Sequence, residues 1–154
     1  MADQVIARKM EIMAKRAVDH ALKTYKVELD FSETSIQKVE SILTDIESTF
    51  PKGLVGRLFK KGPTEQEIES ICNMYGGYIG EIFRQNLGGK WDTTDYFTPG
   101  HKIPCINIGL TTVFPPAKVA KRLSEGKGDD VWFYYQAMKA QLKQQAAKDA
   151  GGEA

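Results

Sequence analysis

Two carboxylates and a histidine are the residues of this chain best suited to acid–base chemistry. Asp92 and Asp95 lie three positions apart in a predicted strand, and His101 follows across a Pro-Gly turn. Carboxylates and imidazole are common general acids and bases. Positions three apart on a strand face opposite sides, so the two carboxylates would converge only at a bulge. We expect a solvated hairpin rim here, with a small hydrolase or transferase site as the alternative.

Other signatures of catalysis are absent from the sequence. It contains no HExxH or GxSxG motif, and its only other histidine is His20, which we expect to be structural. Cys72 falls inside a predicted helix and Cys105 inside a predicted strand, without the spacing of a zinc site. Both are therefore expected to be buried free thiols. We predict no catalytic residue, no metal and no cofactor, although catalytic residues could still converge from distant positions.

A basic loop at residues 51–63, PKGLVGRLFKKGP, offers a different chemistry. Glycine-freed amides beside cations suit a phosphate group, and the cations of this loop are Lys52, Arg57, Lys60 and Lys61. The candidate binding residues of the loop are Arg57, Phe59, Lys60 and Lys61. The loop lacks the GxxxxGK[ST] pattern of nucleotide-binding P-loops. The favoured interpretation is a surface loop whose apolar residues plug the core. Further cations stand in a predicted helix after Pro116, at Lys118, Lys121 and Arg122.

The overall charge argues against a dedicated nucleic-acid binder. The 154 residues include 21 basic and 20 acidic side chains, a net charge of +1, whereas such domains are normally strongly basic. Nucleic acid therefore remains an alternative partner only. The N-terminus lacks the apolar run of a signal peptide, and no stretch reaches membrane-spanning length. We expect a cytoplasmic protein that does not enter a membrane.

Exposed aromatic residues are the third candidate feature. The run Trp132-Phe133-Tyr134-Tyr135 cannot face one way on a helix, so we expect Phe133 and Tyr134 near the surface. Aromatic and arginine side chains are the usual anchors of protein interfaces. Together with the 51–63 loop and the 92–102 hairpin, they form the predicted contact surface for a protein partner.

The elements that must position these residues begin with three helices. Asp3 is a plausible N-cap for a helix to about Tyr25, whose core stripe is widened by Val18, Leu22 and Tyr25. A second helix is predicted from Ser32 to Phe50, before Pro51. The third begins at the capping box Thr64–Glu67 and ends at Gly88-Gly89. Its internal glycines predict a packing notch, for another backbone such as the first helix or for an aromatic ring.

A small antiparallel sheet and two helices complete the predicted fold. Strands are expected at 90–97, anchored by Trp91, Tyr96 and Phe97, and at 103–114. Gly109 is expected to be either a bulge or the bend into a third short strand, so the predicted sheet has two or three strands. Helices follow at 115–126 and from Asp129, its predicted N-cap, to about 146. The sequence therefore predicts a single α+β domain over residues 1–146, with a disordered tail at 147–154.

The second half of the chain also resembles a known family. The segments YGGYIGEIF, GGKW and FPPAKVAKRLSEG, followed by the aromatic helix, cover residues 75–135. In this order they resemble a family of small bacterial α+β domains of unknown function. The resemblance implies a component of bacterial gene clusters, and some small proteins of this kind neutralise secreted toxins. It carries no catalytic residues to transfer.

From the residues and the resemblance together, we expect a non-catalytic protein-interaction module of the bacterial cytoplasm. An immunity or adaptor protein is the specific form of this expectation, and a homodimer is a further option. The alternatives are a phosphate, nucleotide or nucleic-acid binder that uses loop 51–63, and a small enzyme around Asp92, Asp95 and His101.

Overall fold

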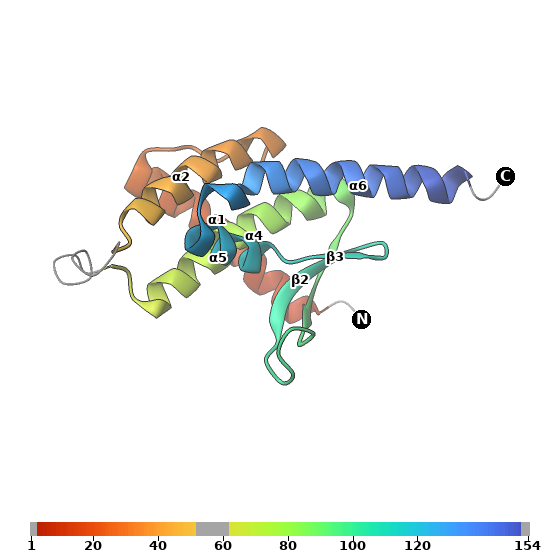
Figure 1. Cartoon of the computed structure of the whole chain (residues 1–154), viewed down its shortest axis with the longest axis horizontal. Helices are drawn as coiled ribbons and strands as arrows, with labels where there is room; N and C mark the ends of the chain where they lie inside the picture. The colour runs from red at the N-terminus through yellow and green to blue at the C-terminus, as the bar shows by residue number, and fades with distance from the viewer. Residues whose placement is uncertain (1–2, 52–61, 152–154) are drawn as a thin grey trace.

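The computed structural model describes residues 3–51 and 62–151 and has an α+β fold, as the sequence predicted. Helices precede a three-stranded sheet, and two further helices follow it (Figure 1). In chain order the elements are α1 (Gln4–Tyr25), a 3-10 turn η1 (Glu33–Ser35), α2 (Ile36–Ser48), α4 (Glu65–Leu87), β1 (Lys90–Thr94), β2 (Ile103–Ile108), β3 (Thr111–Val113), α5 (Pro115–Glu125), η2 (Lys127–Asp129) and α6 (Val131–Gly151).

Helix α4 lies at the centre of the molecule, and its two ends are set by local chemistry. The Thr64 side chain accepts a hydrogen bond from the Glu67 amide at 3.1 Å, which caps the first turn. Gly88 ends the helix with a left-handed φ of +78°, a conformation that glycine adopts without strain. Both ends agree with the prediction.

Each glycine of the α4 notch contacts a different neighbour. A Cβ on Gly76 would overlap the backbone of Pro116 in α5, and one on Gly80 would overlap the indole of Trp91. A Cβ on Gly77 would lie 2.9 Å from the Met10 carbonyl oxygen of α1. The predicted packing notch is therefore present, but only Gly77 faces the first helix.

Helix α1 packs one face against α4. The Asp3 carboxylate accepts from the Val5 amide at 2.9 Å, which confirms the predicted N-cap. The buried stripe follows helical spacing, and its members are Ile6, Met10, Ala14, Ala17 and Ala21. Leu22 was expected in this stripe and is instead exposed, because its position lies beyond the edge of the buried stripe.

The sheet is antiparallel in the order β1-β2-β3. Its inner face presents the cross-strand row Trp91, Ile106 and Val113, all fully buried. The Trp91 indole donates to the buried Glu81 carboxylate of α4 at 3.0 Å. A carboxylate buried in this way is stabilised because Arg84 also donates to it, at 2.7 Å. The sheet is thereby fixed to the C-terminal half of α4.

The last helix is longer than expected. Residues 147–151 were predicted as the start of a disordered tail, but α6 continues to Gly151. Ala147, Lys148 and Ala150 of this segment have high intrinsic helix propensity. In Figure 1 this end of α6 projects beyond the body of the molecule. The helix is capped by Asp130, whose carboxylate accepts from the Phe133 amide at 2.8 Å, and not by Asp129.

None of the helices within residues 3–51 and 62–151 combines the length and the apolar character needed to cross a membrane. The predicted basic loop falls almost entirely on residues 52–61, outside the described residues.

Candidate functional site

The acid–base candidates do not converge. Strand β1 ends at Thr94, so Asp92 lies within the strand and Asp95 lies in the β1–β2 loop. Asp95 accepts a hydrogen bond from the Gly100 amide at 3.0 Å, across the loop. His101 is exposed, and its backbone amide closes the predicted turn. Among the described residues no hydrogen bond or ion pair joins His101 to either carboxylate, and only Asp95 bonds across the loop.

Cys105 lies beside Asp92 but is a poor nucleophile. The two residues are cross-strand partners, and the thiol is buried. Burial raises the pKa of Cys105 to about 11, with a smaller contribution from the Asp92 charge. Burial also raises the pKa of Cys72 to about 11. Since the thiolate is the reactive form, both cysteines are inert at neutral pH.

The outer face of the sheet carries a polar network instead. Asn107 on β2 donates from its amide nitrogen to Asp92 at 3.3 Å and accepts from the Thr112 hydroxyl at 2.8 Å. The network forms the floor of an open groove of about 400 Å³, here called the sheet groove. Tyr96 and Phe114 also line this groove. The groove therefore combines hydrogen-bonding groups with aromatic side chains.

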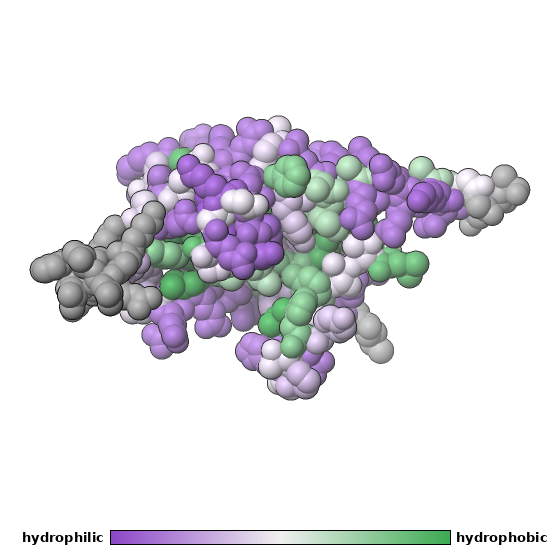
Figure 2. Space-filling model, in the orientation of Figure 1, coloured by the Kyte–Doolittle hydropathy of each residue, from purple (hydrophilic) through white to green (hydrophobic). Residues whose placement is uncertain are grey.

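Three aromatic rings gather at the end of the sheet groove. Tyr96 is 81% exposed and Phe97 is 60% exposed. Their ring centroids lie 5.4 Å apart, and Phe97 contacts Phe114 edge-on at 5.0 Å. We call Tyr96, Phe97 and Phe114 the aromatic patch. Figure 2 shows hydrophobic surface gathered over the sheet region, between the β1–β2 loop and the helical body.

The aromatic patch corrects the sequence prediction. Tyr96 and Phe97 were expected as buried anchors of a strand extending to residue 97. The strand ends at Thr94, however, and the Thr94 hydroxyl accepts from the Tyr96 amide at 3.2 Å, which turns the chain away. The two rings consequently face solvent, where they form no part of the core.

The predicted aromatic pair on α6 behaves unequally. Phe133 is exposed, as expected. Tyr134 is half-buried, with its ring 6.1 Å from Phe83 and the Lys118 ammonium 5.2 Å from its centroid. Burial raises the pKa of Tyr134, although a hydrogen bond with the backbone of Phe114 opposes this rise. Tyr134 is therefore held by Phe83, Lys118 and the Phe114 backbone and is not a free anchor.

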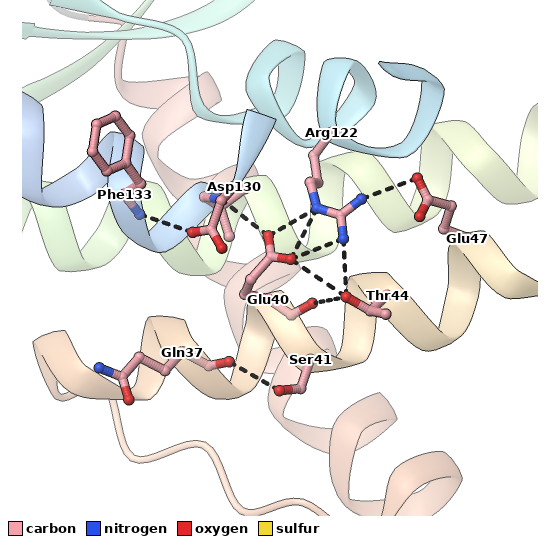
Figure 3. Close-up of polar contacts among 9 residues, drawn as sticks. Gln37, Glu40, Ser41, Thr44, Glu47, Arg122, Asp130 and Phe133 are labelled. Atoms are coloured by element: carbon pink, nitrogen blue, oxygen red, sulfur yellow. Dashed lines mark hydrogen bonds and ion pairs between the residues drawn. The ribbon is translucent and has the colours of Figure 1, made fainter. Parts of the chain in front are cut away.

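The most extensive side-chain network was not predicted. Arg122, which the sequence offered as a further cation for a phosphate ligand, has 0% of its side chain exposed. Its guanidinium donates to both Glu40 carboxylate oxygens at 2.9 Å, to Thr44 at 2.9 Å and to Glu47 at 3.1 Å (Figure 3). Glu40 also accepts from the Val131 amide at the start of α6, at 3.1 Å. We call Arg122, Glu40, Thr44 and Glu47 the arginine cluster.

The arginine cluster joins α2, α5 and the start of α6. Hydrogen bonds to Glu40, above all, raise the pKa of Arg122, so it stays charged. The sequence contains a pattern that could have indicated this cluster. Glu40, Thr44 and Glu47 repeat at helical spacing on α2. On α5, Arg122 shares the buried face with Val119 and Leu123. The cluster is a fixed structural ion pair.

The remaining α5 cations are also occupied. Lys118 and Lys121 both contact the Asp129 carboxylate, at 3.1 and 3.4 Å. The hydrogen bond from Lys118 is the main cause of a lowered pKa at Asp129. The loop residues of the phosphate-binding alternative, Arg57, Phe59, Lys60 and Lys61, lie outside the described residues.

Metal binding has no candidate in this part of the chain. Over residues 3–51 and 62–151 no three histidine, cysteine or acidic side chains are grouped as a metal ion would require.

The feature of the described residues with the clearest capacity to bind a ligand is the sheet groove with its aromatic patch. No protein-family model, no curated protein and no solved structure matches this chain.

Proposed function

We propose that this protein is a non-catalytic interaction module that binds a protein partner at the sheet groove. One observation carries the proposal: the exposed, mutually packed rings of Tyr96 and Phe97, supported from below by Phe114. Aromatic rings offer a large contact area at a low cost in side-chain entropy. They are also the residue types that most often dominate binding energy at protein interfaces.

The floor of the groove suits a polypeptide ligand. Asp92 and Asn107 offer carboxylate and amide groups to the outer face of the sheet, beside the Thr94 and Thr112 hydroxyls. Backbone amides and carbonyls of a partner can pair with such groups, while its apolar side chains cover the rings. The groove is too open to exclude water from a reaction, and its thiol is protonated, which favours binding over catalysis.

An immunity or adaptor role in a bacterial cytoplasm is the specific form of this proposal. It is supported by the resemblance of residues 75–135, which contain both the sheet groove and the aromatic patch. A protein that neutralises a toxin by binding needs no catalytic residues of its own. The partner would then be an enzyme whose active surface is covered.

The test is affinity capture from native lysate, with two matched exposed variants. The Tyr96→Ala/Phe97→Ala double variant removes the exposed rings, and Leu110→Ala removes an exposed side chain at the other hairpin. We expect the unmodified chain and Leu110→Ala to retain one stoichiometric partner that the double variant loses. Retention of that partner by all three proteins would contradict the proposed site. Circular dichroism should show the same fold for each, because these side chains lie outside the core.

A further inference from the structure

Helix α1 has a second face that the fold leaves uncovered. Its inner face is buried against α4, but Val5 is 81% exposed and Ile12 is 45% exposed on the outer side. These two residues are seven apart and therefore lie above one another, two turns apart. Together with Met13 they line a shallow groove of about 340 Å³. An apolar strip on a rigid helix is thus open to solvent.

The same face is strongly basic. Arg8, Lys9 and Arg16 flank the apolar strip and line the groove with it. Helix α1 holds five of the chain's 21 basic residues and only two of its 20 acidic ones. Within residues 3–51 and 62–151, Arg8, Lys9 and Arg16 form no recorded ion pair, whereas Lys15 is paired with Glu11 at 3.6 Å. Basic charge is therefore concentrated on this helix in a chain that is nearly neutral overall.

We propose that this surface, the α1 basic face, binds an acidic amphipathic helix of a partner protein. Carboxylates of the ligand pair with Arg8, Lys9 and Arg16, and its apolar residues, seven apart, cover Val5 and Ile12. A nucleic-acid backbone would satisfy the cations but would leave the aliphatic side chains uncovered. A membrane surface would favour aromatic residues at this position, and the strip has none.

The α1 basic face is also preorganised. The inner residues Ile6, Met10 and Ala14 are buried, so α1 is held on the body before any ligand arrives. Ligand binding therefore orders long side chains but no backbone, which limits its entropic cost. The face does not depend on the sheet groove, so this inference goes beyond the proposed function.

The probe for this proposal is a fluorescein-labelled, N-acetylated peptide of about 18 residues. It carries leucines at heptad spacing with glutamates beside them on an alanine background, and a scrambled peptide of the same composition is the control. Fluorescence anisotropy measures the two affinities at low and physiological salt. We expect the ordered peptide to bind at least about tenfold more tightly than the scrambled one, with an affinity that falls as salt rises.

Variants then locate the binding surface. Arg8→Glu/Arg16→Glu should weaken binding of the ordered peptide about tenfold or more, and Ile12→Ser should weaken it several-fold. The matched charge reversal Lys127→Glu/Lys148→Glu lies on other elements and should change the affinity less than about twofold. Tyr96→Ala/Phe97→Ala should leave peptide binding unchanged even if it abolishes partner capture.

Several outcomes would overturn the proposal. Equal affinity for the ordered and scrambled peptides would show charge attraction without recognition of the apolar strip. Dissociation constants weaker than roughly 1 mM would show no useful binding. Tighter binding to a single-stranded oligonucleotide or to anionic vesicles, lost in Arg8→Glu/Arg16→Glu, would assign the face to that ligand instead.

Discussion

Replacing Arg122 by methionine is expected to destabilise the protein more than any exposed substitution on α5. The variant keeps a side chain of similar length in a fully buried position but removes the positive charge of the arginine cluster. It leaves Glu40 and Glu47 without their shared cation, although the amide of Val131 still donates to Glu40.

The magnitude follows from the burial of the three partners. Breaking a buried ion pair by removing one partner typically costs about 3–5 kcal/mol, because a charge remains uncompensated. Glu40 and Glu47 retain 13% and 21% side-chain exposure, so water can reach them in part. We therefore expect a loss near the lower limit, about 3 kcal/mol. For a chain of this length, that corresponds to a decrease in Tm of roughly 6–12 °C.

Urea unfolding followed by circular dichroism measures this loss, provided that the m-value is unchanged. Lys121→Gln, on the same helix but at a half-exposed ion pair, is the control and should cost less than about 1 kcal/mol. Adding Glu40→Leu to Arg122→Met should cost less than the sum of the two single variants, since it also removes the orphaned charge. A loss below about 1 kcal/mol for Arg122→Met, or strict additivity in the double variant, would refute the assigned role of the cluster.

Three further predictions test other parts of the structure. Gly76→Ala should lower the free energy of unfolding, measured in urea, by about 2 kcal/mol, because the cost of overpacking against α5 exceeds the gain in helix propensity. The control Gly128→Ala, which places no atom within 4 Å of its new Cβ, should leave the free energy of unfolding nearly unchanged. Hydrogen bonds from a lysine and a tyrosine of α6 lower the pKa of Glu33 below its ordinary 4.5, so its stabilising contribution is present above about pH 4.5 and is lost as the pH falls through the folded-state pKa. When the pH falls from about 6 to about 3, Glu33→Gln should therefore lose less in Tm than the unmodified chain. An equal loss of Tm in both proteins would count against the stabilising role of the ionised Glu33 carboxylate. Cys72 and Cys105 should react with Ellman's reagent near pH 8 only as fast as the protein opens, since burial raises both pKa values to about 11, and immediate reaction of the native protein would disprove their burial.

Local chemistry made the helix ends of this chain predictable. Thr64 caps α4, Gly88 ends it, and Pro115 begins α5, each at the position that the sequence indicated. Capping, left-handed backbone and proline geometry depend on a few neighbouring residues, so one sequence suffices to find them. The α+β class followed from the helical spacing before the sheet and the alternation within it.

Tertiary packing decided what the sequence did not reveal. Phe97 and Leu110 are residue types typical of a protein core, yet both side chains face solvent. Strand β1 ends before Phe97, and strand β2 ends before Leu110. Arginine is a residue type typical of protein surfaces, yet Arg122 is buried. Its charge is paired with carboxylates that lie about 80 positions earlier in the chain. Residues 147–151 were misassigned for the opposite reason, since few apolar side chains suggested disorder while helix propensity favours order.

The glycines of α4 also fix how far that helix can slide along its own axis. Gly76 and Gly80 are one turn apart and face Pro116 and Trp91 respectively. Moving α4 by one turn, about 5.4 Å, in one direction would place Cys72 against Pro116. Moving it the other way would place Arg84 against the Trp91 ring. Only the observed register puts a glycine at both contacts, so the notch that permits close packing also excludes the neighbouring helix registers.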